Sequence, residues 1–396
     1  MFIPRFDIIN GLGVDYLHNT LLGVIKMLVK LWFNKKYKSE QWYIGDKVKQ
    51  VDRAIKSLKL PNLISRVPRN IEDDLKQWKA SEYRTFMLCY SAPILVNFLP
   101  TEYFKHYCFL VKALYLLLQD SISESDLLCS SLLLKQFCMQ IERLYGERYN
   151  SYNSHNLLHM TKSVRQLGPL WAQSSFWYED YNGDFKHLFY GTQSVDMQIV
   201  TNTIMQHRIP EIARTLQPGS IGYKLYMKMT VRFHQLTKAT GDFVASGIKT
   251  IGILSKLDPD FPEKSIISHI YPAISDMMRF KRLYFHGCIV QSKAYKRVTK
   301  RNTYTIYYHG RFGYSYGFIK YFLKVSLEAK TEYLAIIEIV TVRKDTMLNG
   351  IEHIIPIKSS NNIDVCKVAD ILEVCSSLSL ASGDYIAHFP NKLEND

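Results

Sequence analysis

The residues best able to do chemistry near the start of the chain are Asp15 and His18, in the run Asp15-Tyr16-Leu17-His18 after Gly13. Side chains three residues apart share one face of a helix, so this carboxylate and this imidazole could approach the same metal ion or phosphate. Aspartate is also a favoured N-cap residue, and Asp15 could serve only to accept a hydrogen bond from a backbone N–H at the helix start. The spacing alone favours the capping role.

A pair of histidines, His155 and His159, has the four-residue spacing of two zinc ligands on a helix. In zinc proteases of this pattern a glutamate follows the first histidine, whereas here that residue is Asn156, and no cysteine lies at zinc-finger spacing. We therefore expect the two histidines to be packed or hydrogen-bonded rather than to bind metal.

A third candidate is Glu179, in the aromatic-rich run from Phe176 to Gly183. A carboxylate is costly to bury without a partner, so an acid among aromatic side chains usually has a role. A second interpretation is equally open, in which Glu179 and Asp180 belong to an exposed turn closed by Asn182 and Gly183.

Basic residues are concentrated between residues 281 and 330, where eleven lysines and arginines accompany one acid, Glu328. The segment holds a surplus of ten charges out of a net +14, with twelve aromatic residues interleaved. Basic groups neutralise phosphates and aromatic faces stack on bases, so the pattern favours a nucleic-acid surface over the alternative, a solvated face of a β domain. The candidate binding residues are Lys293, Tyr295, Lys296, Arg297, Lys300, Arg301, Tyr308 and Arg311.

Two kinds of hydrophobic pattern divide the chain and would position these residues. Helical periodicity covers residues 14–33, almost all of 71–167, and 192–216. A stretch punctuated by glycine and proline follows at 241–272. Beyond it, β-branched and aromatic runs at 304–308, 316–325, 333–342 and 351–357 predict strands of a small barrel-like β domain.

Composition excludes several classes of protein. With 396 residues, 47% hydrophobic and 13% aromatic, the chain is globular rather than disordered. Seven cysteines without a C-x-x-C pair exclude zinc knuckles and a disulfide framework, and favour a reducing compartment. The first residues lack the layout of a signal peptide. The apolar stretch 85–101 contains Pro93 and Asn97, so we expect a buried helix and no membrane partner.

Taken together, the motifs resemble the downstream half of the CACTA (En/Spm-like) group of cut-and-paste DNA transposases. The resemblance covers residues 10–190, and the C-terminal β region is similar to the tail domain of the group, more loosely. The matching segments are Asp15-Tyr16-Leu17-His18, Leu21-Leu22-Gly23-Val24, Lys79-Ala80-Ser81-Glu82-Tyr83-Arg84, Asn153-Ser154-His155-Asn156-Leu157-Leu158-His159, Leu167-Gly168-Pro169-Leu170-Trp171 and Phe176-Trp177-Tyr178-Glu179 with Asn182-Gly183.

The resemblance implies an α+β fold with a partial RNase H-like core interrupted by a helical insertion. The core would occupy residues 1–60 and 168–240, the all-helical insertion 61–167, a linker 241–280, and a basic, barrel-like β domain 281–396. The family also implies three acids that hold two Mg²⁺ or Mn²⁺ ions, which activate water and then a 3′ hydroxyl for attack on phosphodiesters. In that pattern Asp15 is the second acid, with His18 in its motif, and Glu179 is the third; we expect Asp15 and Glu179 to lie close together.

The chain departs from the family at the first acid, which lies on a strand well upstream of the D-x-x-H motif. Only fourteen residues precede Asp15, and Asn19 stands where relatives often have cysteine. We therefore expect a transposase-derived DNA-binding protein of the nucleus, a fragment that is catalytically inactive alone because the first acid is missing. The alternatives are a domesticated, non-catalytic nucleic-acid or chromatin adaptor and, less favoured, a basic protein that docks on membranes or acidic proteins. Homo-oligomerisation stays open.

Overall fold

The computed structural model describes residues 7, 11–64, 66–230, 241–258, 261–297, 300–328, 330–343, 348, 350–392 and 394. It has a mixed α+β fold with 47% helix and 24% strand, as the sequence predicts, and its sheets are antiparallel. The chain forms two compact units, one of residues 1–173 and 241–396 and the other of residues 174–240.

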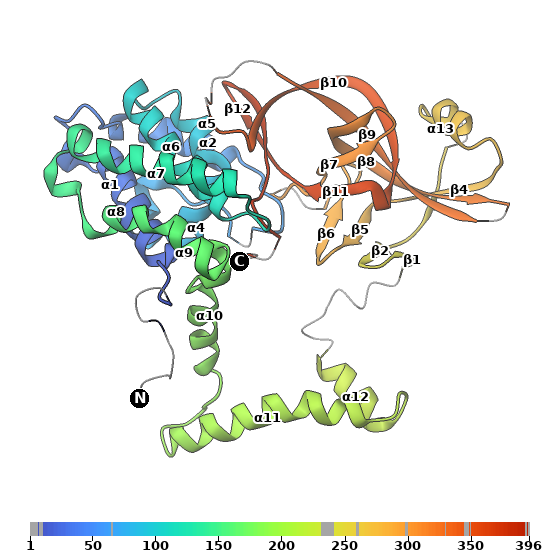
Figure 1. Ribbon diagram of the computed structural model, residues 1–396. Helices are drawn as coiled ribbons and strands as arrows, with labels where there is room; N and C mark the ends of the chain where they lie inside the picture. The colour runs from blue at the N-terminus through green and yellow to red at the C-terminus, as the bar shows by residue number, and fades with distance from the viewer. Residues whose placement is uncertain are drawn as a thin grey trace. The chain divides into compact units, whose positions relative to one another are not determined.

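The first unit begins with a helical block, which we define as residues 11–173 (Figure 1). Its helices are η1 (Leu17–Ile25), α1 (Lys26–Phe33), η2 (Lys35–Tyr37), η3 (Gly45–Lys47), α2 (Val48–Ser57), α3 (Ile71–Asp74), η4 (Leu75–Gln77), α4 (Ala80–Thr85), η5 (Phe86–Tyr90), α5 (Ser91–Leu95), α6 (Thr101–Leu117), α7 (Glu124–Tyr145), η6 (Glu147–Tyr149), α8 (Tyr152–Asn156), η7 (Leu157–His159), α9 (Met160–Leu167) and η8 (Leu170–Gln173).

Local sequence signals set the ends of the two longest helices of this block. Pro100 precedes the first residue of α6, and Ser123 caps α7 by accepting a hydrogen bond from the backbone N–H of Asp126. Gly146 ends α7 with a φ of +99°, a conformation that glycine adopts without a Cβ penalty. Buried aromatic rings join the helices, as where Trp32 meets Tyr107 edge to face at 5.1 Å.

The rest of the first unit is a β block, which we define as residues 241–394. Its elements are β1 (Phe243–Ala245), β2 (Ile248–Ile251), β3 (Ser255–Lys256), α13 (Lys264–Ile270), β4 (Ile274–Phe280), β5 (Arg282–Phe285), β6 (Cys288–Gln291), β7 (Thr305–Gly310), β8 (Gly313–Leu327), β9 (Thr331–Val342), β10 (Ile354–Lys367), η10 (Val368–Asp370), β11 (Ile371–Val374), β12 (Ser376–Leu380) and β13 (Gly383–Ala387).

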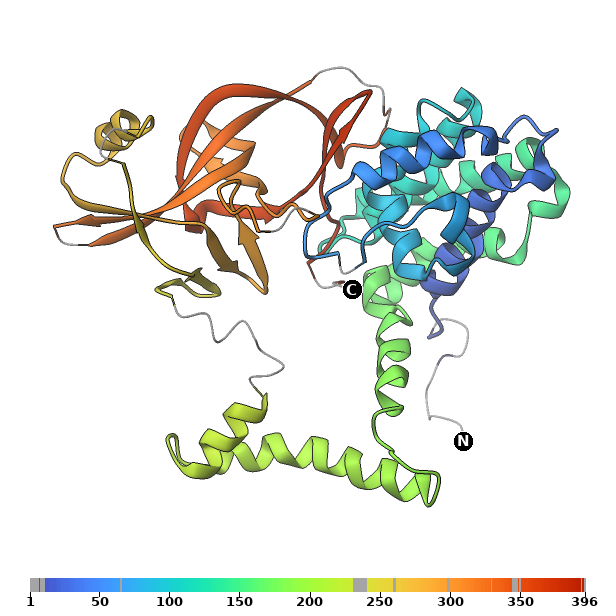
Figure 2. The same cartoon turned by 180° about the vertical axis from the view of Figure 1, so that it is seen from behind.

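The β block is not a closed barrel, which corrects the barrel-like expectation. The large sheet has the order β11-β7-β8-β9-β10-β13-β12, and among the described residues its end strands β11 and β12 do not pair with each other. Strand β8 explains why: one half pairs with β7 and the other half with β4, so the sheet branches instead of closing. Figure 2 shows the long, curved strands β8 to β10 from behind.

Residues 241–280, expected as a linker, contain the strands β1 to β4 and the helix α13. The glycines of this stretch belong to tight turns between short strands: Gly247 and Gly252 have φ values of +74° and +96°. Strands β1 and β2 join β5 and β6 in a second, four-stranded sheet, while β4 pairs with β8.

A buried polar junction joins the helical block to the β block. His353 donates from Nε2 to the carbonyl of Leu88 at 3.0 Å, and its ring stacks on Tyr115 with the centroids 3.8 Å apart. Lys59 makes an isolated β-bridge with Ser377. The two blocks therefore fold as one compact unit.

The second unit contains the helices α10 (Phe176–Phe185), α11 (Val195–Thr215) and α12 (Ile221–Thr230). In the described parts of segments 1–60 and 168–240, all elements of regular secondary structure are helices. These segments alone therefore do not supply the sheet of an RNase H-like core. The apolar stretch 85–101 is divided among α4, η5, α5 and the start of α6. Over the described parts of the chain, no helix has both the length and the apolar character that a bilayer crossing requires.

Candidate functional site

Asp15 lies at the start of η1 and there performs the role of a helix cap. Its Oδ1 accepts a hydrogen bond from the backbone N–H of Leu17 at 3.3 Å, and its Oδ2 accepts one from the N–H of His18 at 3.2 Å. His18 is exposed, and its Nδ1 lies 2.5 Å from the same Oδ2. The carboxylate and imidazole thus share one helix face, as the spacing predicts, and the capping role is confirmed.

Helix η1 opens the chain's first helical segment with π-helical hydrogen bonding, an uncommon geometry that often occurs at functional sites. Its buried face carries Leu17, Leu21, Val24 and Ile25. Gly23 leaves room for the side chain of Asn153, because a Cβ at this position would lie 2.6 Å from the side-chain amide nitrogen of Asn153 and would displace it. Gly23 of the Leu21–Val24 motif thus packs against Asn153 of the Asn153–His159 motif.

Several segments that carry the family resemblance meet at η1. The side chain of Asn19 donates to the carbonyl of Asn153 at 3.0 Å, and helices α4 and α8 both lie against η1. The backbone N–H of Val14 donates to Ser163 Oγ at 3.2 Å, while Gln173 accepts from Ser163 and donates to the carbonyl of Gly168. Segments about 60 to 150 residues apart therefore form one packed assembly around the D-x-x-H motif.

Arg84, from the Lys79–Arg84 motif, forms a buried ion pair near the same helix. Its Nη1 lies 3.4 Å from Oε1 of Glu394, and Tyr16 on η1 also donates to Glu394. The two charged side chains are 9% and 5% exposed, so the pair is almost fully removed from water. Burial, and then the Glu394 carboxylate, raise the pKa of Tyr16 well above its usual value.

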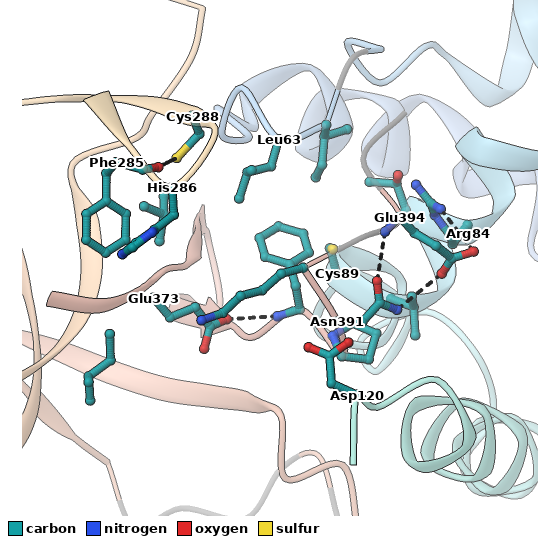
Figure 3. A pocket seen from close by; sticks show the side chains of 18 residues that line it. Leu63, Arg84, Cys89, Asp120, Phe285, His286, Cys288, Glu373, Asn391 and Glu394 are labelled. Carbon is teal, nitrogen blue, oxygen red and sulfur yellow. Dashed lines mark hydrogen bonds and ion pairs between the residues drawn. The ribbon is translucent and has the colours of Figure 1, made fainter. Parts of the chain in front are cut away.

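The pair borders a cavity of about 150 Å³ at the junction of the two blocks (Figure 3). Asn391 helps to close it, since its side chain bonds both Glu394 and the carbonyl of Leu118. On the β-block side Glu373 accepts from the backbone N–H of Phe389 at 3.1 Å. Several polar groups that border the cavity are thus engaged with one another.

Glu179 lies on the exposed part of α10, in the second compact unit, whereas Asp15 belongs to the first. The expected proximity of the two carboxylates therefore stays a prediction. Helix α10 continues through Asn182 and Gly183, so these residues form no turn there. Trp177 and Tyr178 beside Glu179 are also exposed, at 53% and 72%.

His155 and His159 lie together on the surface, with their Nε2 atoms 3.2 Å apart. Within the described ranges, no third histidine, cysteine or acid joins them in a cluster able to hold a metal ion. The expectation that the two histidines are packed or hydrogen-bonded agrees with this contact.

Five of the eleven basic residues of segment 281–330 pair with acids outside the segment. In four of these pairs the acid lies more than forty residues away in the sequence. The pairs therefore offset five of the ten surplus charges counted along the sequence. The pairs are Lys293–Glu338, Lys320–Glu263 at 2.6 Å, Lys324–Asp242 at 2.7 Å, Lys330–Glu332 at 2.7 Å and Arg311–Asp364 at 2.7 Å.

Two of the candidate nucleic-acid residues, Tyr308 and Arg301, make contacts inside the protein. Tyr308 is fully buried and donates from its hydroxyl to Asp364 at 3.2 Å, so its ring offers no face for a base. Arg301 donates from Nη1 to the carbonyls of Pro61 and Ile64, which fixes it at the junction of the blocks. Neither role could be seen locally, because both partners are more than fifty residues away.

Lys296, Arg297 and Lys300 remain as an exposed basic trio in the connection from β6 to β7. Among the described residues, none of the three has an acidic side chain within ion-pair distance. Nearby in sequence, Tyr295 is half-buried, with the guanidinium of Arg282 4.7 Å from its ring centroid. We call Lys296, Arg297 and Lys300 the basic trio.

The β block also brings together Glu373, Cys375 and His388, a cluster that is not among the sequence-based predictions. Its signal lay in the turn between β12 and β13, where only Ala381 and Ser382 separate the strands. A two-residue hairpin turn fixes the register and places residues 375 and 388 opposite each other.

Comparison of the chain with protein-family models, with curated proteins and with solved structures finds no match.

Proposed function

We propose that this chain is a transposase-derived protein of the nucleus that binds DNA through the basic trio and has no catalytic activity alone. The observation that carries the binding proposal is the exposure of Lys296, Arg297 and Lys300 without acidic partners among the described residues. Lysine and arginine that neutralise phosphates release condensed counterions, which supplies most of non-specific DNA affinity. The transposase lineage is supported by the packing of the resembling segments around η1.

The residues around Asp15 do not fit the Mg²⁺ or Mn²⁺ site that the family implies. Hard divalent cations take several oxygen ligands, and Asp15 supplies a single carboxylate whose oxygens already cap η1 and contact His18. In the described part of the chain, Asp15 belongs to no cluster of three metal-binding side chains. We therefore assign no metal-dependent step to this chain.

The salt dependence of DNA binding tests the proposal. In a titration of fluorescent duplex DNA, replacing Lys296, Arg297 and Lys300 together by glutamine should flatten the plot of log affinity against log salt. The expected change is about 0.9 per lost phosphate contact on duplex DNA, and about 0.7 on single strands. The matched control replaces Lys35, Lys36 and Lys38, three exposed lysines of the helical block, by glutamine. Equal slopes for the two triple variants would refute the trio as the binding site.

A nuclease assay tests the inactivity of the lone chain. The purified protein with Mg²⁺ or Mn²⁺ should leave supercoiled DNA intact. A single carboxylate that already caps a helix leaves the ion with too few oxygen ligands. Metal-dependent nicking that is lost in Asp15→Ala would contradict the proposal.

The second candidate function, a domesticated nucleic-acid or chromatin adaptor, is favoured by the capping role of Asp15. If the chain is an adaptor, Asp15→Asn should leave DNA binding unchanged in the presence and absence of Mn²⁺. If a metal bridges Asp15 to DNA or to Glu179, Mn²⁺ should tighten DNA binding by the parent, and the substitution should abolish that effect.

A further inference from the structure

Three side chains of types that bind metal ions meet in the β block. Glu373, Cys375 and His388 each offer one ligand atom, and these atoms all lie within 4.8 Å of one another. Cys375 is fully buried, while His388 and Glu373 are 16% and 22% exposed. Over the described residues, this is the one cluster of its kind.

The hairpin of β12 and β13 builds this cluster. Ser376 pairs with Ala387 at the open end of the hairpin, and the next pair outward in the same register is Cys375 and His388. Glu373 comes from β11, which pairs with β7 on the other side of the large sheet. Glu373 lies within β11, and Cys375 and His388 lie one residue beyond the paired ends of β12 and β13, where the neighbouring strand pairing limits their movement.

We propose that Glu373, Cys375 and His388 bind one zinc ion, with Tyr316 orienting the histidine ring. Thiolate, imidazole and carboxylate together form a donor set that suits Zn²⁺ better than Mg²⁺ or Ca²⁺.

The distances leave room for such an ion. Cys375 Sγ and His388 Nδ1 are 4.0 Å apart, less than the sum of a zinc–sulfur bond of about 2.3 Å and a zinc–nitrogen bond of about 2.1 Å. Glu373 Oε2 now lies 2.7 Å from Nδ1, at hydrogen-bond distance. Zinc would replace the proton between these two atoms, and the partly exposed Glu373 would move aside by a few tenths of an ångström.

Tyr316 supplies the supporting contact that zinc-bound histidines usually have. Its hydroxyl lies 2.7 Å from Nε2 of His388, on the ring nitrogen that faces away from Cys375 and Glu373. When Nδ1 binds the ion, Nε2 carries the proton and donates to the Tyr316 oxygen, while the Cys375 thiol gives its proton to solvent. The charges therefore balance with no further reactant.

The three side chains leave one position of a tetrahedral zinc ion for a further ligand. Glu373 also borders the cavity of Figure 3, so a water molecule from that side can complete a tetrahedral shell. The competing interpretation is a metal-free hydrogen bond between His388 and Glu373 beside an inert thiol.

Metal content and cobalt spectroscopy of the full chain test the proposal. After chelation and dialysis, addition of Zn²⁺ should restore about one bound ion per chain and raise the melting temperature, since a ligand that binds only the folded state stabilises it. Co²⁺ in place of zinc should give the intense absorption of tetrahedral cobalt with a thiolate-to-metal band. Cys375→Ser should lose that band, and Glu373→Gln should weaken zinc binding even if Cys375→Ser folds poorly.

The variant Tyr316→Phe distinguishes a residue that supports the zinc-binding histidine from a residue that binds zinc itself. Loss of an outer contact should weaken zinc affinity by about 10–100-fold while the cobalt thiolate band persists. Two controls isolate the site: Cys288→Ser, at a cysteine that borders the same cavity, and the double variant His155→Gln/His159→Gln. Both should bind zinc as the parent does.

Two results would overturn the proposal. One is a parent chain that takes up no zinc and whose melting temperature does not respond to it. The other is zinc retained by Cys375→Ser and Glu373→Gln but lost in the His155/His159 double variant.

Discussion

The ion pair that joins the two blocks and the ion pairs on the surface of the β block have different surroundings. Arg84 of the helical block pairs with Glu394, at the end of the β block, almost out of contact with water. Within the β block, Lys293 with Glu338 and Lys324 with Asp242 are between 26% and 39% exposed. Breaking a buried pair leaves a charge in a medium that solvates it poorly, whereas an exposed pair contributes little stability but changes the field outside the protein. The same chemistry thus stabilises the junction of the blocks in one place and sets the surface potential in the other.

The largest effect should come from the buried pair. Glu394→Gln should lower the free energy of unfolding by about 3–5 kcal/mol, because Arg84 is left charged and buried. Urea denaturation followed by circular dichroism measures the change. The control is Glu102→Gln, whose partner Arg143 forms an exposed pair with it, and for which the loss should stay below about 1 kcal/mol. Equal losses of unfolding free energy in Glu394→Gln and Glu102→Gln would contradict the prediction that the buried pair contributes more stability than the exposed pair.

A second effect concerns the neutral histidine at the junction of the blocks. Burial lowers the pKa of His353 to about 3, against an ordinary value near 6.5. The unfolded chain therefore takes up a proton before the folded chain does. The contribution of the neutral His353 to the free energy of unfolding is therefore fully present above pH 6.5. As the pH drops from 6.5 toward 3, this contribution falls by about 1.4 kcal/mol per pH unit.

Urea midpoints measured between pH 7 and pH 5 should show this slope, and His106, whose burial lowers its pKa to about 4, should add to it. His353→Gln removes the titrating group and should flatten the slope. His309→Gln, at an exposed position of β7, is the control for loss of a histidine. A slope unchanged in His353→Gln would contradict the prediction.

The smallest effect should come from releasing the paired lysines. Glu338→Gln with Asp242→Asn frees Lys293 and Lys324 to meet phosphates. The salt slope of duplex binding should steepen by up to about 0.9 for each lysine that gains a contact. Glu102→Gln with Glu124→Gln, which frees Arg143 and Arg165 in the helical block, is the matched control. If both double variants steepen the slope equally, net charge rather than position sets the binding.

Regular local signals were sufficient to locate much of the fold. Helical periodicity over residues 14–33 located η1 and α1, and β-branched runs located β7, β8 and β9 within a few residues. Residues 241–280 resemble a linker in the sequence because the strands there are only two to seven residues long, too short to give a clear alternating pattern between the glycine turns.

The site was harder to predict because its determinants act between distant residues. The charge count over 281–330 could not include Glu263, Asp242 or Glu338, which reach the lysines only through strand pairing and side-chain packing. The burial of Tyr308 depends on Asp364, 56 residues away. By contrast, the capping by Asp15 is a contact within three residues, and the sequence alone indicated it.

The contact of Tyr16 and Arg84 with Glu394 also has a consequence for the order in which the protein folds during synthesis. A ribosome releases the helical block first, and at about 5–20 residues per second the partner of Arg84 follows only about 15–60 s later. Until then the Arg84 guanidinium and the Tyr16 hydroxyl lack this carboxylate. The contact that joins the start of η1 and α4 to the end of the β block therefore forms only after nearly all of the β block has been translated.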